Sequence, residues 1–185
     1  MQAFDYLSVM VSIVLGLGVT QLLTTLGVII RERDRLKPYW LTVLWIGILI
    51  LAHIQTWWAM FGMREVADWS FLGFFMLLLQ PILLYLLSSL LTPNLDRDTD
   101  MEAAFERQTR AFFGTFILLL LVSLAKDLVI GGRLPDAPNL GAHVLFLTLS
   151  AIGALTRRRR VHEIMGPVTA LLMLAYIGAL FMRLD

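Results

Sequence analysis

The sequence predicts an all-α integral membrane protein in which six transmembrane helices form a single antiparallel bundle. Hydrophobic residues make up 58% of the 185 residues and charged residues only 16%, a composition too apolar for a soluble domain. Six apolar runs lie close to the ~20 residues that a helix needs to cross ~30 Å of hydrocarbon. Little of the chain remains outside them, so we expect one transmembrane domain over 1–185 and no separate soluble domain.

The positively charged residues lie in alternate gaps between these runs. Eleven of the fifteen Lys and Arg residues follow the first, third and fifth runs. Basic residues in short loops are retained on the cytoplasmic side, so the pattern predicts a plasma or inner membrane protein with both termini outside the cytoplasm. The eleven are Arg31, Arg33, Arg35, Lys37, Arg97, Arg107, Arg110, Arg157, Arg158, Arg159 and Arg160.

The first three spans are predicted from long apolar sequence. The first covers 6–30 and contains no charged residue, and the second covers 39–63, between Pro38 and Arg64. The third covers 69–91 and is again uncharged. Backbone groups in hydrocarbon must be satisfied within their own segment, so each run is predicted to be an α-helix.

The last three spans follow the same reasoning. The fourth covers 111–130 and includes Lys126 and Asp127 as its only charged residues. The fifth, 140–155, is the shortest, and the sixth covers 164–184. The connections after the first, second, fourth and fifth spans are tight, which predicts that sequential helices pack as antiparallel neighbours.

The connection at 94–110 is long, and we expect it to be a cytoplasmic helical linker. Thr99 and Glu102 have the Thr-x-x-Glu spacing of a capping box. This spacing predicts a helix that begins at Asp100 and runs into the fourth span.

Composition and motif spacing exclude several classes of function. The absence of cysteine excludes disulfides, thiolate metal sites and thiol catalysis. Asp96, Asp98 and Asp100 alternate as in a calcium-binding loop, but Met101 replaces the glycine required at position six. No basic patch lies outside the expected inner loops, so we expect no nucleic-acid binding, and we expect no metal and no cofactor.

One fragment is typical of an enzyme. Ser123 and Lys126 have the S-x-x-K spacing that places a serine beside a lysine on one helical face. The companion motifs of the serine acyl-transferases are absent, so the sequence favours a protein that is not an enzyme. An intramembrane enzyme remains an alternative.

Polar side chains inside the predicted spans are the candidate site residues, because ionisable groups in hydrocarbon are costly and usually face the bundle interior. His53 and Gln80 lie ~14–16 Å from the outer ends of adjacent helices, near the midplane. We expect a hydrogen bond between them, either as a structural pair or as a station in a polar path. Thr56 extends this face outward.

Four further residues lie near the outer ends of their spans: Asp5, Lys126, Asp127 and His143. Each can reach headgroup water alone, or together they form a charged mouth above His53, Thr56 and Gln80. Ser12 belongs to a stripe of small and polar residues on the first span. Such a stripe either lines an aqueous groove or lets a neighbouring helix approach closely.

These residues favour a small transport- or channel-like protein with an outward-facing polar cavity for an ion, a proton or a small solute. A bundle of this size has little room for a wide conduction path. We therefore expect a homo-oligomer. One alternative is a non-catalytic scaffold or accessory subunit that binds a protein partner through its cytoplasmic loops. Another is a protein that holds a b-type haem between His53 and His143.

Overall fold

The computed structural model describes residues 3–66, 68–92 and 100–180. In this part of the chain six helices are long and apolar enough to cross a membrane. The chain is therefore an all-α, multi-pass integral membrane protein, as the composition predicts. The helices are α1 (Ala3–Arg31), α2 (Trp40–Met60), α3 (Phe71–Leu91), α4 (Met101–Gly131), α5 (Ala137–Leu155) and α6 (Arg159–Leu180), with a short 3₁₀ helix, η1 (Phe61–Met63), after α2.

Helix α4 begins where the sequence predicts a helix that runs into the fourth span. The end of the expected linker and the fourth span form one continuous helix. The N-cap is Asp100, whose side chain accepts a hydrogen bond of 3.1 Å from the Ala103 N–H. Thr99, the expected capping residue, lies outside the described residues. Gly132 ends the helix with φ 65°, a left-handed conformation that glycine adopts without steric cost.

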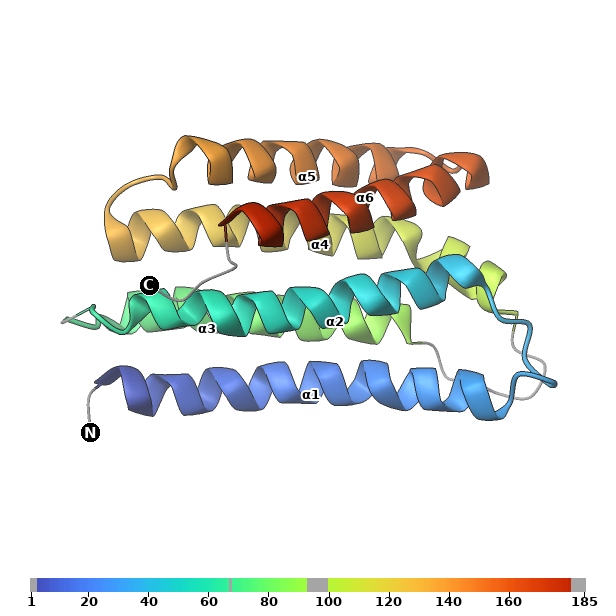
Figure 1. The fold of residues 1–185 in the computed structure, drawn as a ribbon, viewed down its shortest axis with the longest axis horizontal. Coiled ribbons are helices and arrows are strands. Elements are labelled where there is room, and N and C mark those ends of the chain that lie inside the picture. Colours follow the sequence, from blue (N-terminus) through green and yellow to red (C-terminus); the bar gives the residue numbers. More distant parts are fainter. Residues whose placement is uncertain (1–2, 67, 93–99, 181–185) are drawn as a thin grey trace.

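The six helices run alternately along one long axis (Figure 1). The connection from α1 to α2, the start of α4 and the connection from α5 to α6 lie at the same end of the bundle. We call this the basic end, because ten of the eleven clustered Lys and Arg residues lie there and the eleventh, Arg97, is outside the described residues. The opposite end holds the start of α1 and the connections from α2 to α3 and from α4 to α5.

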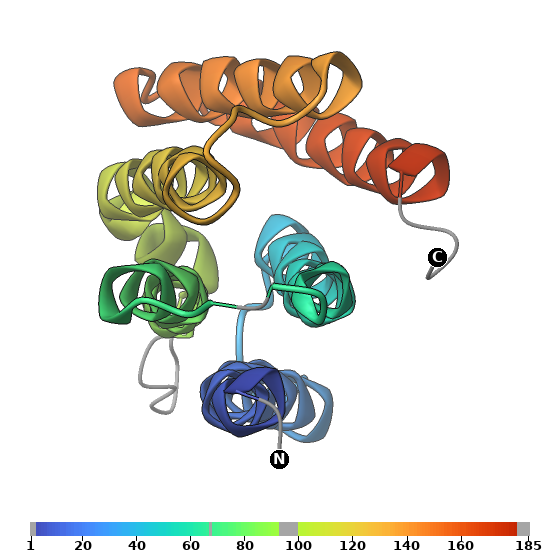
Figure 2. The ribbon, with the colours of Figure 1, turned by 90° about the vertical axis from the view of Figure 1, so that its left-hand side faces the viewer.

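Helix α1 lies at one side of the bundle, against α2 and α3 (Figure 2). Gln21 joins it to α3, since its amide donates to Thr92 Oγ1 at 2.8 Å and its Oε1 accepts from Ser89 Oγ at 3.3 Å. Hydrogen bonds between side chains in hydrocarbon contribute about 0.6–2 kcal/mol. Gln21 therefore links α1 to α3.

Helix α4 lies between α3 and α5, and α6 contacts both α2 and α5 (Figure 2). Midway along the bundle an aromatic cluster fills the space between α2 and α4. The Trp45 ring lies 5.1 Å from Phe112, 5.5 Å from Phe113 and 6.2 Å from Phe116, measured between ring centroids. All four side chains are buried, and their edge-to-face geometry is a favourable arrangement of aromatic rings.

Candidate functional site

A cavity of about 240 Å³ lies toward the opposite end of the bundle, and five helices contribute to its wall. We call it the polar cavity. Its floor includes Phe116 of the aromatic cluster, and the rest of the wall combines apolar and polar side chains. The polar residues that line it are Gln55, Thr56, Gln80, Ser123, Lys126, Asp127, Asn139, His143 and Tyr176.

Lys126 is the buried cation of this cavity, with a side chain only 10% exposed. Its Nζ lies 3.3 Å from the Gln80 Oε1 and 3.6 Å from the Asp127 Oδ1. An ammonium group has three N–H donors, so two partners leave one donor for a molecule in the cavity. A buried charge without partners is costly, and here an amide and a carboxylate together compensate for it.

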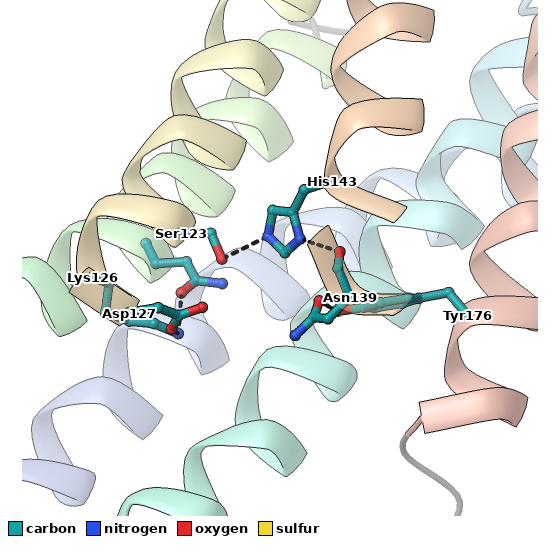
Figure 3. Close-up of polar contacts among 7 residues, drawn as sticks. Ser123, Lys126, Asp127, Asn139, His143 and Tyr176 are labelled. Carbon is teal, nitrogen blue, oxygen red and sulfur yellow. Dashed lines mark hydrogen bonds and ion pairs between the residues drawn. The ribbon is translucent and has the colours of Figure 1, made fainter. Parts of the chain in front are cut away.

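His143 links α5 to α4 at the same level. Its Nδ1 lies 2.9 Å from the Asn139 carbonyl oxygen and its Nε2 lies 3.2 Å from the Ser123 Oγ (Figure 3). A carbonyl oxygen only accepts, so Nδ1 carries a hydrogen, and in the neutral form of the ring Nε2 accepts from the serine hydroxyl. The pair is thus arranged for proton transfer from Ser123 to His143.

Tyr176 connects α6 to the hydrogen-bonded residues on α5. Its hydroxyl donates to the Asn139 Oδ1 at 2.9 Å, so Asn139 contacts His143 through its backbone and Tyr176 through its side chain. Figure 3 shows Ser123, Lys126 and Asp127 on one side of the site and Asn139 and Tyr176 on the other, with His143 between them. The site therefore offers a cation, a carboxylate, hydroxyls and amides within a partly apolar wall.

Two classes of chemistry suit this arrangement. The mixed donors and acceptors can bind a small polar solute, since ligand sites typically combine apolar walls with a few placed polar groups. The same hydroxyl and imidazole groups can relay a proton. Among the described residues, no three His, Asp or Glu side chains lie close enough together to hold a metal ion.

The structure brings together five of the predicted site residues: Thr56, Gln80, Lys126, Asp127 and His143. The prediction of a hydrogen bond between His53 and Gln80 is wrong, because the Gln80 side chain accepts a hydrogen bond from Lys126 instead. His53 does not line the polar cavity. Its ring, 1% exposed, packs against α1 at Gly18, where a Cβ atom would overlap the Nε2.

The two other candidates, Asp5 and Ser12, lie on α1, which does not contribute to the polar cavity. Ser12 and Ser8 line a separate cavity of about 200 Å³ beside Trp57 and Trp58. Farther along the predicted small-residue stripe, Gly16, Thr20 and Thr24 are exposed. In this part of α1 the stripe therefore turns away from α2 and α3.

The haem alternative required both His53 and His143 to face one pocket. Instead, the His53 ring faces α1 and the His143 ring faces α4. Only His143 lines the polar cavity. The structure therefore does not bring the two proposed axial ligands together.

Sequence reasoning missed Gln55, Asn139 and Tyr176, and it considered Ser123 only as part of an enzyme motif. Asn139 directly follows Pro138 at the start of α5, where a polar residue is typical of a helix end. Tyr176 is the one hydroxyl in the second half of α6 within the described residues, and that position was its only signal.

Comparison with known proteins finds no match among family models, curated proteins or solved structures. The functional argument therefore depends on the geometry of the site alone.

Proposed function

We propose that this integral membrane protein is of the transport type and takes an ion, a proton or a small polar solute into the polar cavity. The main support is the cavity itself, in which five helices direct charged and hydrogen-bonding side chains toward a shared space inside an otherwise apolar bundle. The deepest of these groups, Gln80, lies near the midplane, where a polar group is costly. Under this proposal the basic end is cytoplasmic and the polar cavity opens to the outside.

A second cavity supports a path through the bundle. It lies at the basic end and is lined by the segment of α4 that ends at Arg110, whereas the polar cavity begins at Phe116. At 1.5 Å per residue the separation along α4 is about 9 Å. Phe112 and Phe113 occupy this interval with Trp45 beside them. In this proposal the aromatic cluster is the barrier that must rearrange during transport.

A test that needs no knowledge of the solute uses the natural absence of cysteine. Ser123→Cys places one thiol in the polar cavity, and Leu121→Cys places one on an exposed face of the same helix as a matched control. Both variants are prepared in inside-out vesicles and treated with a membrane-impermeant thiol reagent. Transport predicts that the cysteine at 123 reacts from the basic end and that the control does not.

The rival function is a non-catalytic scaffold, in which the polar groups only hold the bundle together. A scaffold does not require the aromatic cluster to rearrange, so it does not require access to the polar cavity from the basic end. If the cysteine at 123 stays unreacted from the basic end while reacting from the opposite end, transport is contradicted and the scaffold is favoured. Homo-oligomer formation and binding of a partner protein by the basic loops stay predictions.

One observation favours a second candidate function, acyl transfer. The Ser123 Oγ lies 3.2 Å from the His143 Nε2, and in the neutral form of the ring the hydroxyl donates to it, as a serine nucleophile and its general base require. A fluorophosphonate probe reacts with serines activated in this way. Acyl transfer predicts labelling of the native chain that is lost in Ser123→Ala, whereas transport alone predicts none.

A further inference from the structure

The cavity at the basic end has a volume of about 470 Å³ and lies between the start of α4 and the start of α6. We call it the arginine cavity, since Arg107, Arg110, Arg157 and Arg159 line it, and Glu106 is the one acidic residue among its described lining residues. Retention of positive charge in the cytoplasm explains arginines in the loops, but it requires no cavity between helices. The presence of four arginines around one cavity between helices therefore needs its own explanation.

Three of the four arginines are available to a ligand. Arg159 is engaged, since its guanidinium lies 2.5 Å from a Glu102 carboxylate oxygen and 2.7 Å from a Glu163 carboxylate oxygen. Within the described part of the chain, Arg107, Arg110 and Arg157 form no ion pair. The positive charge at this cavity is therefore only partly neutralised by the protein.

A buried histidine forms part of the cavity wall. His162 is 5% exposed and stacks on Phe113, with ring centroids 5.6 Å apart. Its Nε2 lies 3.3 Å from the Thr156 carbonyl oxygen, but its buried Nδ1 has no partner among the described residues. A buried polar nitrogen without a partner is costly. This nitrogen is itself too deeply buried to contact a ligand in the cavity, so His162 contributes to the wall of the site without a hydrogen bond to its ligand.

Tyr39, just before α2, also lines the cavity and stays neutral there. Burial raises the pKa of its hydroxyl above the ordinary value near 10, and the Glu163 carboxylate raises it further, although Arg159 opposes the rise. The Arg159 guanidinium lies 5.7 Å from the centroid of the Tyr39 ring. A neutral phenol remains a hydrogen-bond donor to an anion.

From the three arginines without an ion pair and the Tyr39 side chain that lines the same cavity, we propose that the arginine cavity binds a phosphate group. Guanidinium forks match phosphate oxygens in a bidentate geometry, which suits arginine better than lysine to this task. The cavity lies at the ends of transmembrane helices, so the phosphate can belong to an anionic phospholipid headgroup or to free inorganic phosphate. The inference does not depend on transport by the polar cavity.

The test compares two double variants of the full chain, purified in detergent. Arg110→Gln with Arg157→Gln removes two lining arginines that make no ion pair. Arg158→Gln with Arg160→Gln removes equal charge from the same end of the bundle, but neither residue lines the cavity. Thermal unfolding is followed at constant ionic strength with phosphatidylglycerol, with phosphatidylcholine as the lipid control, and with inorganic phosphate.

We expect phosphatidylglycerol or phosphate to raise the Tm of the native chain and of the Arg158/Arg160 variant. The Arg110/Arg157 variant should bind about tenfold more weakly or worse, because charge-assisted hydrogen bonds are lost. A shift with the lipid alone identifies the headgroup as the source, and a shift with phosphate alone identifies the free anion. If the double variant does not fold, the single change Arg110→Gln gives the same comparison.

Two results would overturn the proposal. One is the absence of any stabilisation of the native chain by either probe. The other is an equal loss in the two double variants, which would show diffuse attraction to the whole basic end instead of binding in the cavity.

Discussion

At the scale of single residues, the polar cavity depends on how Lys126 is held. Its ammonium group is buried between the Gln80 amide and the Asp127 carboxylate. The cost of removing a partner differs from the cost of removing the charge, because an uncompensated buried charge is the more expensive state. Substitution of the amide therefore tests the pairing more directly than substitution of the lysine.

Gln80→Leu should lower the free energy of unfolding by about 1–3 kcal/mol, since the Lys126 ammonium loses an acceptor that no other residue replaces. Gln55→Leu is the matched control, because Gln55 lines the same cavity and makes no side-chain hydrogen bond with a described residue. Its effect should stay within about 0.5 kcal/mol. Unfolding by SDS in mixed micelles measures both. Equal losses in the two variants would show that the Lys126–Gln80 contact contributes nothing.

A second prediction concerns the contact between His53 and α1. Gly18→Ala should destabilise the protein by about 1–3 kcal/mol, because the new methyl group overlaps the imidazole. Gly16→Ala, two residues away on the same helix, meets no atom within 4 Å and should stabilise by roughly 0.5–1 kcal/mol. The additional change His53→Ala should recover part of the Gly18→Ala loss. Unchanged stability in Gly18→Ala would show that the His53 ring does not pack against α1 at Gly18.

At the scale of elements, α4 organises the molecule. It contributes Ser123, Lys126 and Asp127 to the polar cavity and Arg107 and Arg110 to the arginine cavity. Between these sets it presents phenylalanines to Trp45 of α2. The two cavities are therefore separated by packing between α2 and α4, and this contact is where a moving barrier is expected.

Phe116→Ala should open the barrier from the side of the polar cavity. We expect faster reaction of the cysteine at 123 from the basic end, together with a loss of about 3–5 kcal/mol in unfolding free energy. Leu118→Ala changes an exposed position on the same helix and should leave the reaction rate unaltered. The comparison is made by timed thiol labelling in inside-out vesicles. An unaltered rate in Phe116→Ala would mean that Phe116 is not part of the barrier.

The element boundaries were largely predictable, because hydrocarbon demands long apolar helices and charged residues end them. The site was only partly predictable. Thr56, Gln80, Lys126, Asp127 and His143 were identified from their cost in a membrane. Their partners were not, because each residue turns the helix by about 100° and the rotation of α3 relative to α4 has no local signal. This rotation directs Gln80 to Lys126 instead of to His53.

At the scale of the whole molecule, all the described basic connections lie at one end of the bundle, as their alternate spacing predicts (Figure 1). Orientation in the membrane is tested by single cysteines in the connections. Arg33→Cys, at the basic end, should react with an impermeant reagent only in inside-out vesicles. Arg133→Cys, at the opposite end, should react in intact cells. The reverse pattern would invert the proposed orientation.

The central claim is that a water-filled polar cavity opens away from the basic end. The most direct test is the rate at which an impermeant thiol reagent modifies Ser123→Cys in intact cells, compared with Leu121→Cys. The account predicts rapid modification at 123 and little at 121, because a thiol reacts as the thiolate, which forms in water but not in lipid. Equal and slow modification at both positions would contradict it, since the cavity would then be closed to the outside.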